Sequence, residues 1–255
     1  MEQATTAQAF LDLHKKGDPL ILYNVWDAAT AKAVENAGAK AIATGSHSVA
    51  QAHGFDDGEA LPLDLLLTIV RRIVATTSLP VSVDFEGGFA VGPDEVAGNV
   101  SKLLATGVVG LNFEDQIVGG EGLYTVDVQA DRIAAALSAG DEKSMPLVIN
   151  ARTDLFLKMT DNSQHSSLIG EAVERAEAYE QAGAKSFFVP GLVDPDLISQ
   201  ICEVVALPIN IMMKPGAPSV QVLAGLRVAR ISYGPFAFSD AIAALEERAR
   251  EALGT

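Results

Sequence analysis

The sequence predicts an α/β protein with the architecture of a (β/α)8 barrel of the TIM type. Three observations favour this fold. Short runs of apolar, often β-branched residues alternate with alanine-rich amphipathic segments along the chain. Several amphipathic segments end in glycine directly before the next apolar run, which is where a helix is expected to stop. The eight runs fit into 255 residues, a length typical of a (β/α)8 barrel.

The apolar runs are expected to be parallel strands buried on both faces, because they are short, largely apolar and separated by helical patterns. A doubly wound open sheet is the alternative architecture, but no G-x-G-x-x-G motif follows the first run. The expected strands span residues 20–25, 41–44, 81–85, 110–114, 147–151, 186–189, 209–212 and 228–232.

The segments between these runs are expected to be helices. Those with the clearest ends span residues 28–36, 94–104, 170–181 and 220–223, and each is followed closely by a glycine. The last segment, 239–253, is amphipathic, with Ile242, Leu245 and Ala249 on its apolar side. No linker or low-complexity stretch interrupts the pattern. We therefore expect residues 1–255 to form one barrel domain with 239–253 as its C-terminal helix.

Composition excludes several classes of protein. Hydrophobic residues make up 49% of the chain and charged residues 20%, which argues against intrinsic disorder. Lys and Arg number 18 against 33 Asp and Glu, a net charge of −15, so nucleic acids and anionic membrane surfaces are poor partners. The one cysteine, Cys202, excludes an internal disulfide framework and a cysteine-rich metal site. Without an apolar span or a signal-like start, the expected location is the cytoplasm.

Acidic residues stand at the ends of the third and fourth expected strands. Asp84 and Glu86 are two residues apart and share one face, and Glu114 ends the next strand. In a barrel these carboxylates meet at the carboxyl end of the strands, where like charges repel unless a cation is present. Such a set of oxygen ligands suits Mg²⁺, with Mn²⁺ possible. The alternative is that they are solvated acids at the beginnings of loops.

The fifth expected strand ends with a cation in an otherwise acidic region. Arg152 shares its face with Asn150, and both are expected to contact the substrate. An arginine at a strand end can hold a carboxylate through two parallel hydrogen bonds. The alternative role is an ion pair with Glu114 or Asp154, and the two roles are compatible.

The second expected strand leads into a possible anion-binding loop. Backbone N–H groups after Gly45, at Ser46 and His47, have the arrangement that can bind a developing oxyanion. His47 has two alternative roles, a general base or a polar contact beneath a lid, and we favour the second. The three residues are expected to bind substrate.

Five segments together resemble the isocitrate lyase/phosphoenolpyruvate mutase superfamily over residues 18–240. "VDFEGGFA" resembles its D-x-D-x-G-Y-G segment, "LNFED" its L-E-D strand end, and "NARTDLF" its A-R-x-[DE] strand. "SVAQAHGFDDGE" resembles its second loop, and "NVWDAATAKAVENAGAKAIATG" its opening. The order and barrel spacing of these motifs are specific for the superfamily.

This resemblance implies Mg²⁺ and chemistry on a 2-oxo or 2-hydroxy carboxylate through a pyruvate-enolate-like species. It also implies a last helix exchanged between subunits, and hence a homodimer or homotetramer. Position by position, it implies that Asp84 and Glu86 hold the metal directly or through water and that Glu114 holds the hydrated ion. It also implies that Arg152 binds the substrate carboxylate and that Gly45, Ser46 and His47 hold the 2-oxo acid. Asp57 matches an acid near the metal or substrate. Arg152 and Glu114 are the expected catalytic residues.

The sequence departs from the specialised members of this family after the fourth strand. Isocitrate-cleaving and methylisocitrate-cleaving lyases carry a K-[KR]-C-G-H loop there, and the mutase and phosphonopyruvate hydrolase pattern has a lysine directly after the E-D pair. Residues 115–124 here contain no Cys, Lys or His. Tyr124 is the candidate proton donor on this loop, although a loop tyrosine more often simply packs.

We therefore predict a Mg²⁺-dependent lyase or decarboxylase that cleaves a C–C bond in a small oxo-acid such as oxaloacetate. Two alternatives remain open. One is C–P bond chemistry on phosphonopyruvate, as a mutase or hydrolase. The other is a 2-oxo-acid-binding protein without catalytic activity.

Overall fold

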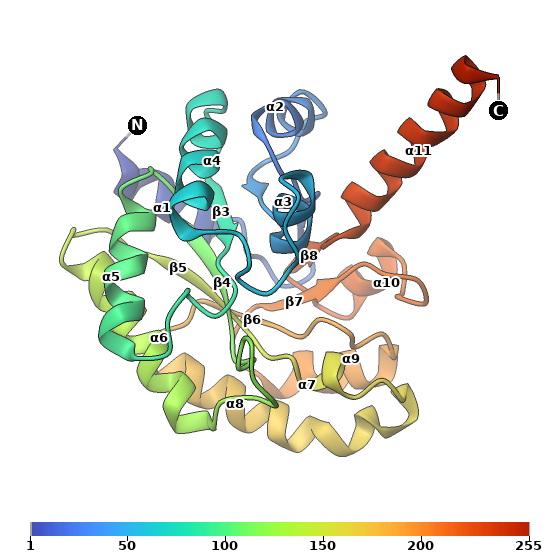
Figure 1. The fold of residues 1–255 in the computed structure, drawn as a ribbon. Helices are drawn as coiled ribbons and strands as arrows, with labels where there is room; N and C mark the ends of the chain where they lie inside the picture. Colours follow the sequence, from blue (N-terminus) through green and yellow to red (C-terminus); the bar gives the residue numbers. More distant parts are fainter. Residues whose placement is uncertain (1, 255) are drawn as a thin grey trace.

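Residues 2–254 are described by a computed structural model, in which eight parallel strands form a nearly closed barrel (Figure 1). The order around the sheet is β1-β8-β7-β6-β5-β4-β3-β2, so each strand lies beside its neighbours in sequence. The strands are β1 Leu20–Leu22, β2 Ile42–Ala43, β3 Val81–Asp84, β4 Gly110–Glu114, β5 Val148–Arg152, β6 Ser186–Phe188, β7 Ile209–Met212 and β8 Arg230–Ser232. The predicted (β/α)8 barrel is confirmed.

The barrel closes at a weak seam between β1 and β2. These two strands are joined by a single bridge between Val25 and Thr44, just beyond the end of β1. The amide of Val25 donates to the carbonyl of Ala43 (2.9 Å), and the amide of Gly45 donates to the carbonyl of Val25 (3.3 Å). Every other neighbouring pair among the described strands is joined by at least two registered residue pairs.

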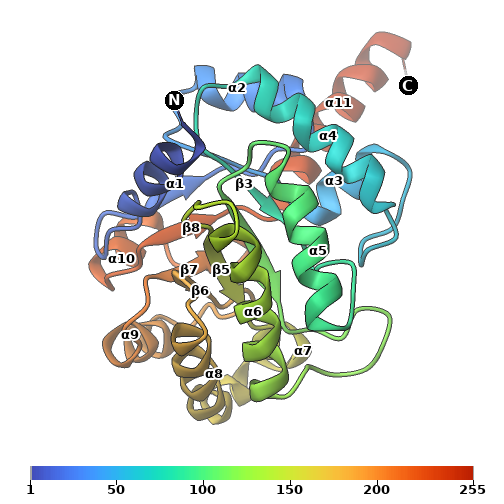
Figure 2. The same cartoon turned by 90° about the vertical axis from the view of Figure 1, so that its left-hand side faces the viewer.

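Helices surround the outside of the barrel, and α5, α6 and α8 lie side by side along one flank (Figure 2). Gly38, Gly107 and Gly183 have positive φ angles shortly after α2, α5 and α8, so three of the predicted helix stops are confirmed. The fourth is wrong, because α10 continues through Gly225. The helices are α1 Gln3–Asp12, α2 Ala28–Asn36, α3 Ser46–Ala52, α4 Leu63–Thr76, α5 Pro93–Leu104, α6 Val126–Asp141, α7 Leu155–Lys158, α8 Ile169–Gln181, α9 Pro195–Val204, α10 Val220–Gly225 and α11 Phe236–Leu253, with a 3-10 helix at Asn162–Leu168.

Local sequence explains several of these helices. Asp27 and Thr30 form a reciprocal capping box at the start of α2, and Asp194 caps α9 directly before Pro195. Cys202 is buried in α9, as expected for a core helix residue, and burial raises the pKa of its thiol to about 11. Among residues 2–254 no helix combines the length and the apolar character needed to cross a membrane.

The inside of the barrel is polar towards the carboxyl ends of the strands. Asn150 donates to Asn112 Oδ1 (2.9 Å) and accepts from the Ser186 hydroxyl (2.6 Å). Arg230, fully buried at the start of β8, also donates to Asn112 Oδ1 (2.9 Å). Asn112 Oδ1 therefore accepts two hydrogen bonds, which turns the amide nitrogen of Asn112 towards Asp84.

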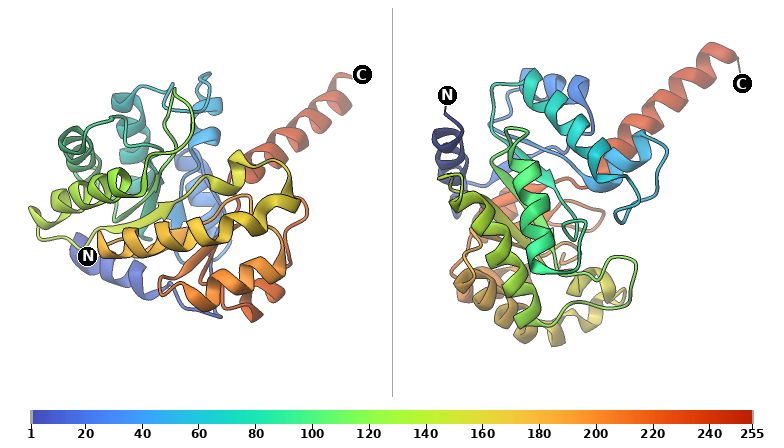
Figure 3. Two further views of the ribbon diagram at one scale, coloured as in Figure 1. Left: turned by 90° about the horizontal axis from the view of Figure 1, so that it is seen from below. Right: turned by 60° about the vertical axis from the view of Figure 1, so that its left-hand side comes forward.

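The C-terminal helix α11 projects away from the barrel instead of covering it, as three views agree (Figures 1 and 3). Ala237 is its one buried residue, while Leu245 is 63% exposed. On the outer side of the barrel, Ile21 and Tyr23 are also partly exposed. An apolar helix face and an apolar patch on the barrel are thus both uncovered in the single chain.

Candidate functional site

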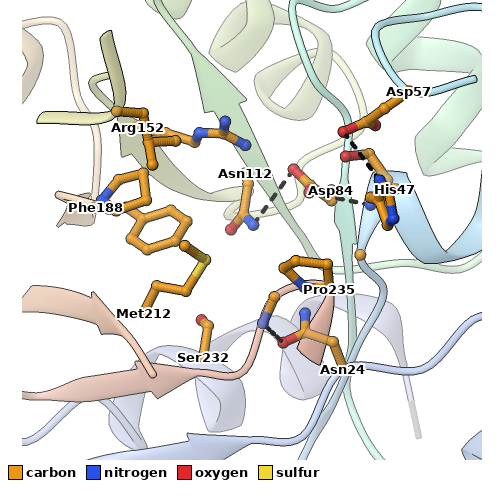
Figure 4. Close-up of a pocket in the computed structure, with 15 residues that line it drawn as sticks. Asn24, His47, Asp57, Asp84, Asn112, Arg152, Phe188, Met212, Ser232 and Pro235 are labelled. Atoms are coloured by element: carbon orange, nitrogen blue, oxygen red, sulfur yellow. Dashed lines mark hydrogen bonds and ion pairs between the residues drawn. The ribbon is translucent and has the colours of Figure 1, made fainter. Parts of the chain in front are cut away.

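A cavity of about 230 Å³ opens at the carboxyl ends of the strands, where barrel enzymes place their chemistry (Figure 4). It contains most of the predicted substrate residues. The lining residues are Asn24, Gly45, Ser46, His47, Asp57, Asp84, Asn112, Arg152, Leu157, Phe188, Pro190, Met212, Ser232, Gly234 and Pro235. A polar cavity of about 200 Å³ adjoins it, shares Ser46, Asp57 and Arg152 with it, and is also lined by Glu86 and Glu114.

Asp84 is the predicted metal ligand that faces the main cavity. Its Oδ2 accepts a hydrogen bond from the amide of Ser46 (3.1 Å), and Asn112 Nδ2 lies 3.5 Å from its Oδ1 (Figure 4). Burial raises the pKa of the Asp84 carboxyl, and the nearby charge of Arg152 partly offsets this effect.

Glu86 and Glu114 face the adjoining polar cavity rather than converging on Asp84. Glu86 Oε2 accepts from the amide of Glu59 (2.7 Å), and Glu86 has a positive φ of 48°. Burial raises the pKa of Glu86 to about 8, and repulsion by Asp84 and Asp57 adds to the effect. Burial also raises the pKa of Glu114, against the influence of Arg152.

These acids have the oxygen donors that suit a hard cation. In the described part of the chain no group of three or more His, Cys, Asp or Glu side chains is arranged to hold a metal ion. The raised pKa values of Asp84, Glu86 and Glu114 show that their negative charges are poorly compensated by the protein. Mg²⁺ commonly binds through one or two carboxylates and keeps several waters, so the donor set fits a hydrated ion held mainly at Asp84.

Arg152 is held in place by two acids. Its Nη1 lies 2.9 Å from Glu114 Oε2, while its Nε and Nη2 donate to the two oxygens of Asp154 (2.6 and 3.0 Å). Burial opposes the positive charge, but Glu114 and Asp154 outweigh it and raise the pKa of the guanidinium. The predicted ion pair and the predicted position in the cavity therefore occur together, and the ion pairs orient the guanidinium.

A buried network supports this arrangement from behind. Asp115 Oδ1 accepts from the amide of Asp154 (3.0 Å), and its Oδ2 accepts from Arg175 (3.1 Å) and from the Tyr179 hydroxyl (3.0 Å). Asp154 in turn binds Arg152. Asp115, which directly follows Glu114, therefore fixes the segment that carries Arg152.

The loop after β2 reaches the cavity, but two of its amides already have partners. The amide of Gly45 donates to the carbonyl of Val25, and that of Ser46 donates to Asp84. The amide nest was expected at Ser46 and His47, and the Ser46 amide is not free for it because its hydrogen bond orients Asp84. The His47 amide, in the first turn of α3, has no carbonyl partner within the helix. His47 Nδ1 lies 3.9 Å from Asp57 Oδ2, and both side chains are roughly half exposed.

Two predicted residues lie outside the main cavity. Asn150 is fully buried behind Asn112, which occupies the lining position expected for it. Tyr124 lines a separate cavity with Glu59, and its ring lies 4.1 Å from the guanidinium carbon of Arg132. This cation–π contact fixes the ring outside the lining of the main cavity, and the role of Tyr124 as a proton donor stays a prediction.

Sequence reasoning missed much of the cavity lining. Asn24 and Asn112 supply amides, and Phe188 and Met212 supply apolar surface. The last two occupy the ends of β6 and β7 as Arg152 does in β5, so the same strand-end position was the available signal. Glu59 was also missed; its carboxylate accepts from the amide of Phe89 (2.7 Å) and ties the second loop to the turn after β3.

The raised pKa of Glu86 predicts how the stability of the metal-free protein depends on pH. Between pH 4.5, the ordinary value, and about 8, the folded state binds more protons at Glu86 than the unfolded state does. The free energy of unfolding should therefore decrease as pH rises through this range, and Glu86→Gln should make the decrease smaller. Urea unfolding at pH 5.5 and 8.0 measures it, with the exposed Glu121→Gln as control. An identical slope in wild type and Glu86→Gln would contradict the assignment.

The chain is similar to known proteins in sequence and in fold. The family model for phosphoenolpyruvate phosphomutase matches residues 10–253. A solved structure described as a "putative phosphonomutase" from Burkholderia cenocepacia J2315 is 41% identical, with a TM-score of 0.94, and the match covers 99% of this chain and 100% of that one.

Two curated relatives are named as a lyase and a decarboxylase. A 2-methylisocitrate lyase from Escherichia coli is 31% identical over 218 residues, covering 82% of this chain and 70% of the relative. An oxaloacetate decarboxylase from Pseudomonas entomophila is 26% identical over 245 residues, covering 92% and 81%. Because the family model spans nearly all of a barrel with these strand-end residues, the chain belongs to the phosphoenolpyruvate mutase family within the isocitrate lyase/phosphoenolpyruvate mutase superfamily.

Proposed function

We propose that this protein is a Mg²⁺-dependent carbon–carbon lyase or decarboxylase that acts on a small 2-oxo or 2-hydroxy carboxylate. One observation carries the proposal: a single small cavity joins an incompletely neutralised acid, Asp84, to a rigidly held cation, Arg152. A metal ion at the first and a carboxylate at the second would bind the two ends of a 2-oxo acid.

The residues of the chain have separable roles in this reaction. Asp84 would hold the ion, with Glu86 and Glu114 acting through its waters, and Mg²⁺ supplies Lewis-acid stabilisation when bound. Arg152, fixed by Glu114 and Asp154, orients the substrate carboxylate so that the bond to C3 lies in position to break. His47 and Asn112 line the same cavity, and their amide groups would stabilise the charge that develops in a pyruvate-enolate-like intermediate.

The loop after β4 favours the simplest cleavage. Decarboxylation requires charge stabilisation and a proton for C3, whereas aldol or Claisen-type cleavage also requires a base. Residues 115–124 contain no Cys, Lys or His, and Tyr124 is held on Arg132. Decarboxylation is therefore the reaction that these residues support best, in line with the similarity to an oxaloacetate decarboxylase.

A screen for product release tests the proposal. Oxaloacetate and a panel of 2-oxo and 2-hydroxy acids are incubated with the protein, with Mg²⁺ and with EDTA, and pyruvate is measured. We expect Mg²⁺-dependent release at rates above the uncatalysed reaction. Release of pyruvate from phosphonopyruvate, or conversion of phosphonopyruvate into phosphoenolpyruvate, would instead establish the C–P alternative, which the similarity to the Burkholderia protein favours. Stabilisation by oxalate and Mg²⁺ without any turnover would indicate a binding protein.

We also propose that α11 packs on a second copy of the chain, in a homodimer or homotetramer. The uncovered apolar face at Leu245 and the partly exposed Ile21 and Tyr23 on the barrel support this assembly.

Deletion of residues after Asp240 should therefore cause dissociation or aggregation, because it leaves the apolar surface of the neighbouring barrel exposed. Sedimentation velocity of the full-length and shortened proteins at micromolar concentration measures the effect. A full-length protein that sediments as a monomer would contradict the assembly.

A further inference from the structure

The mouth of the main cavity has a polar side and a more apolar side (Figure 4). Strands β3, β4 and β5 supply Asp84, Asn112 and Arg152. Five further lining residues are apolar, and we call them the apolar wall: Leu157, Phe188, Pro190, Met212 and Pro235. The polar residues Ser232 and Asn24 line the same part of the cavity as Met212 and Pro235 (Figure 4), and Leu157 also lines the adjoining polar cavity. Phe188 lies directly beside Arg152 in the sheet register, so the change from charged to apolar occurs between neighbouring strands.

The apolar wall does not continue an apolar core beneath it. Ser186 and Phe188 share one face of β6, and Asn210 and Met212 share one face of β7. The lower member of each pair is polar, fully buried and hydrogen-bonded. On these inward faces of β6 and β7, apolar side chains therefore begin only at the cavity. This indicates that they contact the ligand rather than fill the interior of the barrel.

The wall is also fixed in position. Phe188 is 4% exposed. A Cβ atom on Gly234, whose φ is 53°, would lie 2.5 Å from Met212 Sδ, so the thioether lies closely against this glycine. The wall thus offers the ligand a preformed surface.

A second anionic group on this side would lack a counter-charge. Among the residues that line the cavity, Arg152 and His47 are the possible cations, and Lys158, which follows Leu157, lines the adjoining polar cavity instead. Arg152 is already paired with Glu114 and Asp154, and His47 lies on the acidic side beside Asp57. Placing a carboxylate or phosphonate against the wall would therefore remove it from water without a partner.

We propose that the substrate is a 2-oxo or 2-hydroxy acid with an alkyl group at C3, and that the apolar wall binds this group. The inference rests on the proposed function, because Arg152 and the metal site must fix the 2-oxo acid for the substituent to reach the wall. A cavity of about 230 Å³ suits a short chain and lies below the ~300–1,000 Å³ of drug-sized pockets.

Calorimetric titration of the full-length protein with saturating Mg²⁺ tests the inference. The ligands are oxalate, pyruvate, 2-oxobutanoate, 2-oxopentanoate and 2-oxoglutarate. Each added methylene should tighten binding about fourfold, giving about 15-fold between pyruvate and 2-oxopentanoate. 2-Oxoglutarate, which carries a carboxylate in place of the terminal methyl group of 2-oxopentanoate, should bind at least about tenfold more weakly than that ligand.

Two adjacent methionines provide a matched pair of variants. Met212→Gln should reduce the gain from pyruvate to 2-oxopentanoate to less than about fivefold, because a polar amide replaces part of the wall. Met213→Gln should leave the gain as in the wild type, since Met213 follows the end of β7 and does not line the cavity.

The ligand series in the wild type separates the two hypotheses without relying on a variant. Binding of oxalate and pyruvate with no gain along the series, or a preference for 2-oxoglutarate, would overturn the alkyl assignment and leave the proposed function intact. Failure to bind any of the five ligands would overturn the proposed function, and the alkyl assignment with it.

Discussion

Replacement of Asp84 by alanine is expected to weaken the affinity for oxalate in the presence of Mg²⁺ by at least about 100-fold. Asp84 is the predicted metal ligand that faces the main cavity, and Glu86 and Glu114 face the adjoining one. Without its carboxylate, the ion that would bridge protein and oxalate has no direct protein ligand there. Calorimetric titration with oxalate and Mg²⁺ measures the loss.

The same substitution should leave the protein folded. Asp84 is repelled by Asp57 and Glu86 but attracted by Arg152 and Arg230, so its removal relieves some repulsion and loses some attraction. The hydrogen bond from Ser46 is lost as well, and the free energy of unfolding should fall by about 1 kcal/mol. Asp56→Ala, at an exposed position of the second loop, controls for the change in net charge. Oxalate affinity that is unaffected by both Asp84→Ala and EDTA would rule out the metal assignment.

Arg152→Lys should weaken oxalate binding by about 30-fold or more. Loss of one partner in a buried, charge-assisted pair typically costs about 2–5 kcal/mol. Lysine keeps the positive charge but lacks the planar fork that contacts Glu114 and both oxygens of Asp154. One ammonium group cannot reproduce these three contacts and also bind the ligand, so the affinity for the ligand carboxylate should fall most.

The affinity for Mn²⁺ without ligand should change little in this variant, because Arg152 is not a metal ligand. Electron paramagnetic resonance of Mn²⁺ gives that affinity, and thermal unfolding reports on the fold. Arg71→Lys, at an exposed position on α4, serves as the control. A variant that fails to fold would show that the ion pairs are chiefly structural, and a variant with wild-type oxalate affinity would show that the carboxylate binds elsewhere.

The fold and the polar side of the cavity could be predicted because they depend on local patterns. Buried strands show as apolar runs, and their ends are marked by residues such as Asp84 and Arg152. Same-face spacing did not determine which inward residue reaches the cavity. Asn112 and Asn150 are register partners on neighbouring strands, yet Asn112 lines the cavity and Asn150 lies behind it. The tilt and stagger of the barrel, which no local pattern encodes, decide between them.

Other features depend on contacts between distant segments. Tyr124 contacts Arg132 of the following helix, a pairing that cannot be predicted from their spacing along the chain. The amide of Ser46 is engaged by Asp84, 38 residues later in the chain. The path of α11 away from its barrel also cannot be read from its amphipathic pattern, because the same pattern suits its own barrel or a neighbouring one.

Gly45, which helps to close the barrel at the weak seam between β1 and β2, also lines the main cavity. Gly45 donates to Val25 across this seam, and the next residue, Ser46, donates to Asp84 in the cavity. A local opening of the seam would displace the ligand-binding loop without disturbing the other strand pairs. Since linkage is reciprocal, a ligand that binds only the closed loop makes this opening less favourable, and the hydrogen exchange of the Val25 and Gly45 amides should then report on occupancy. In this barrel, one of the hydrogen bonds that complete the ring is made by a residue of the cavity lining.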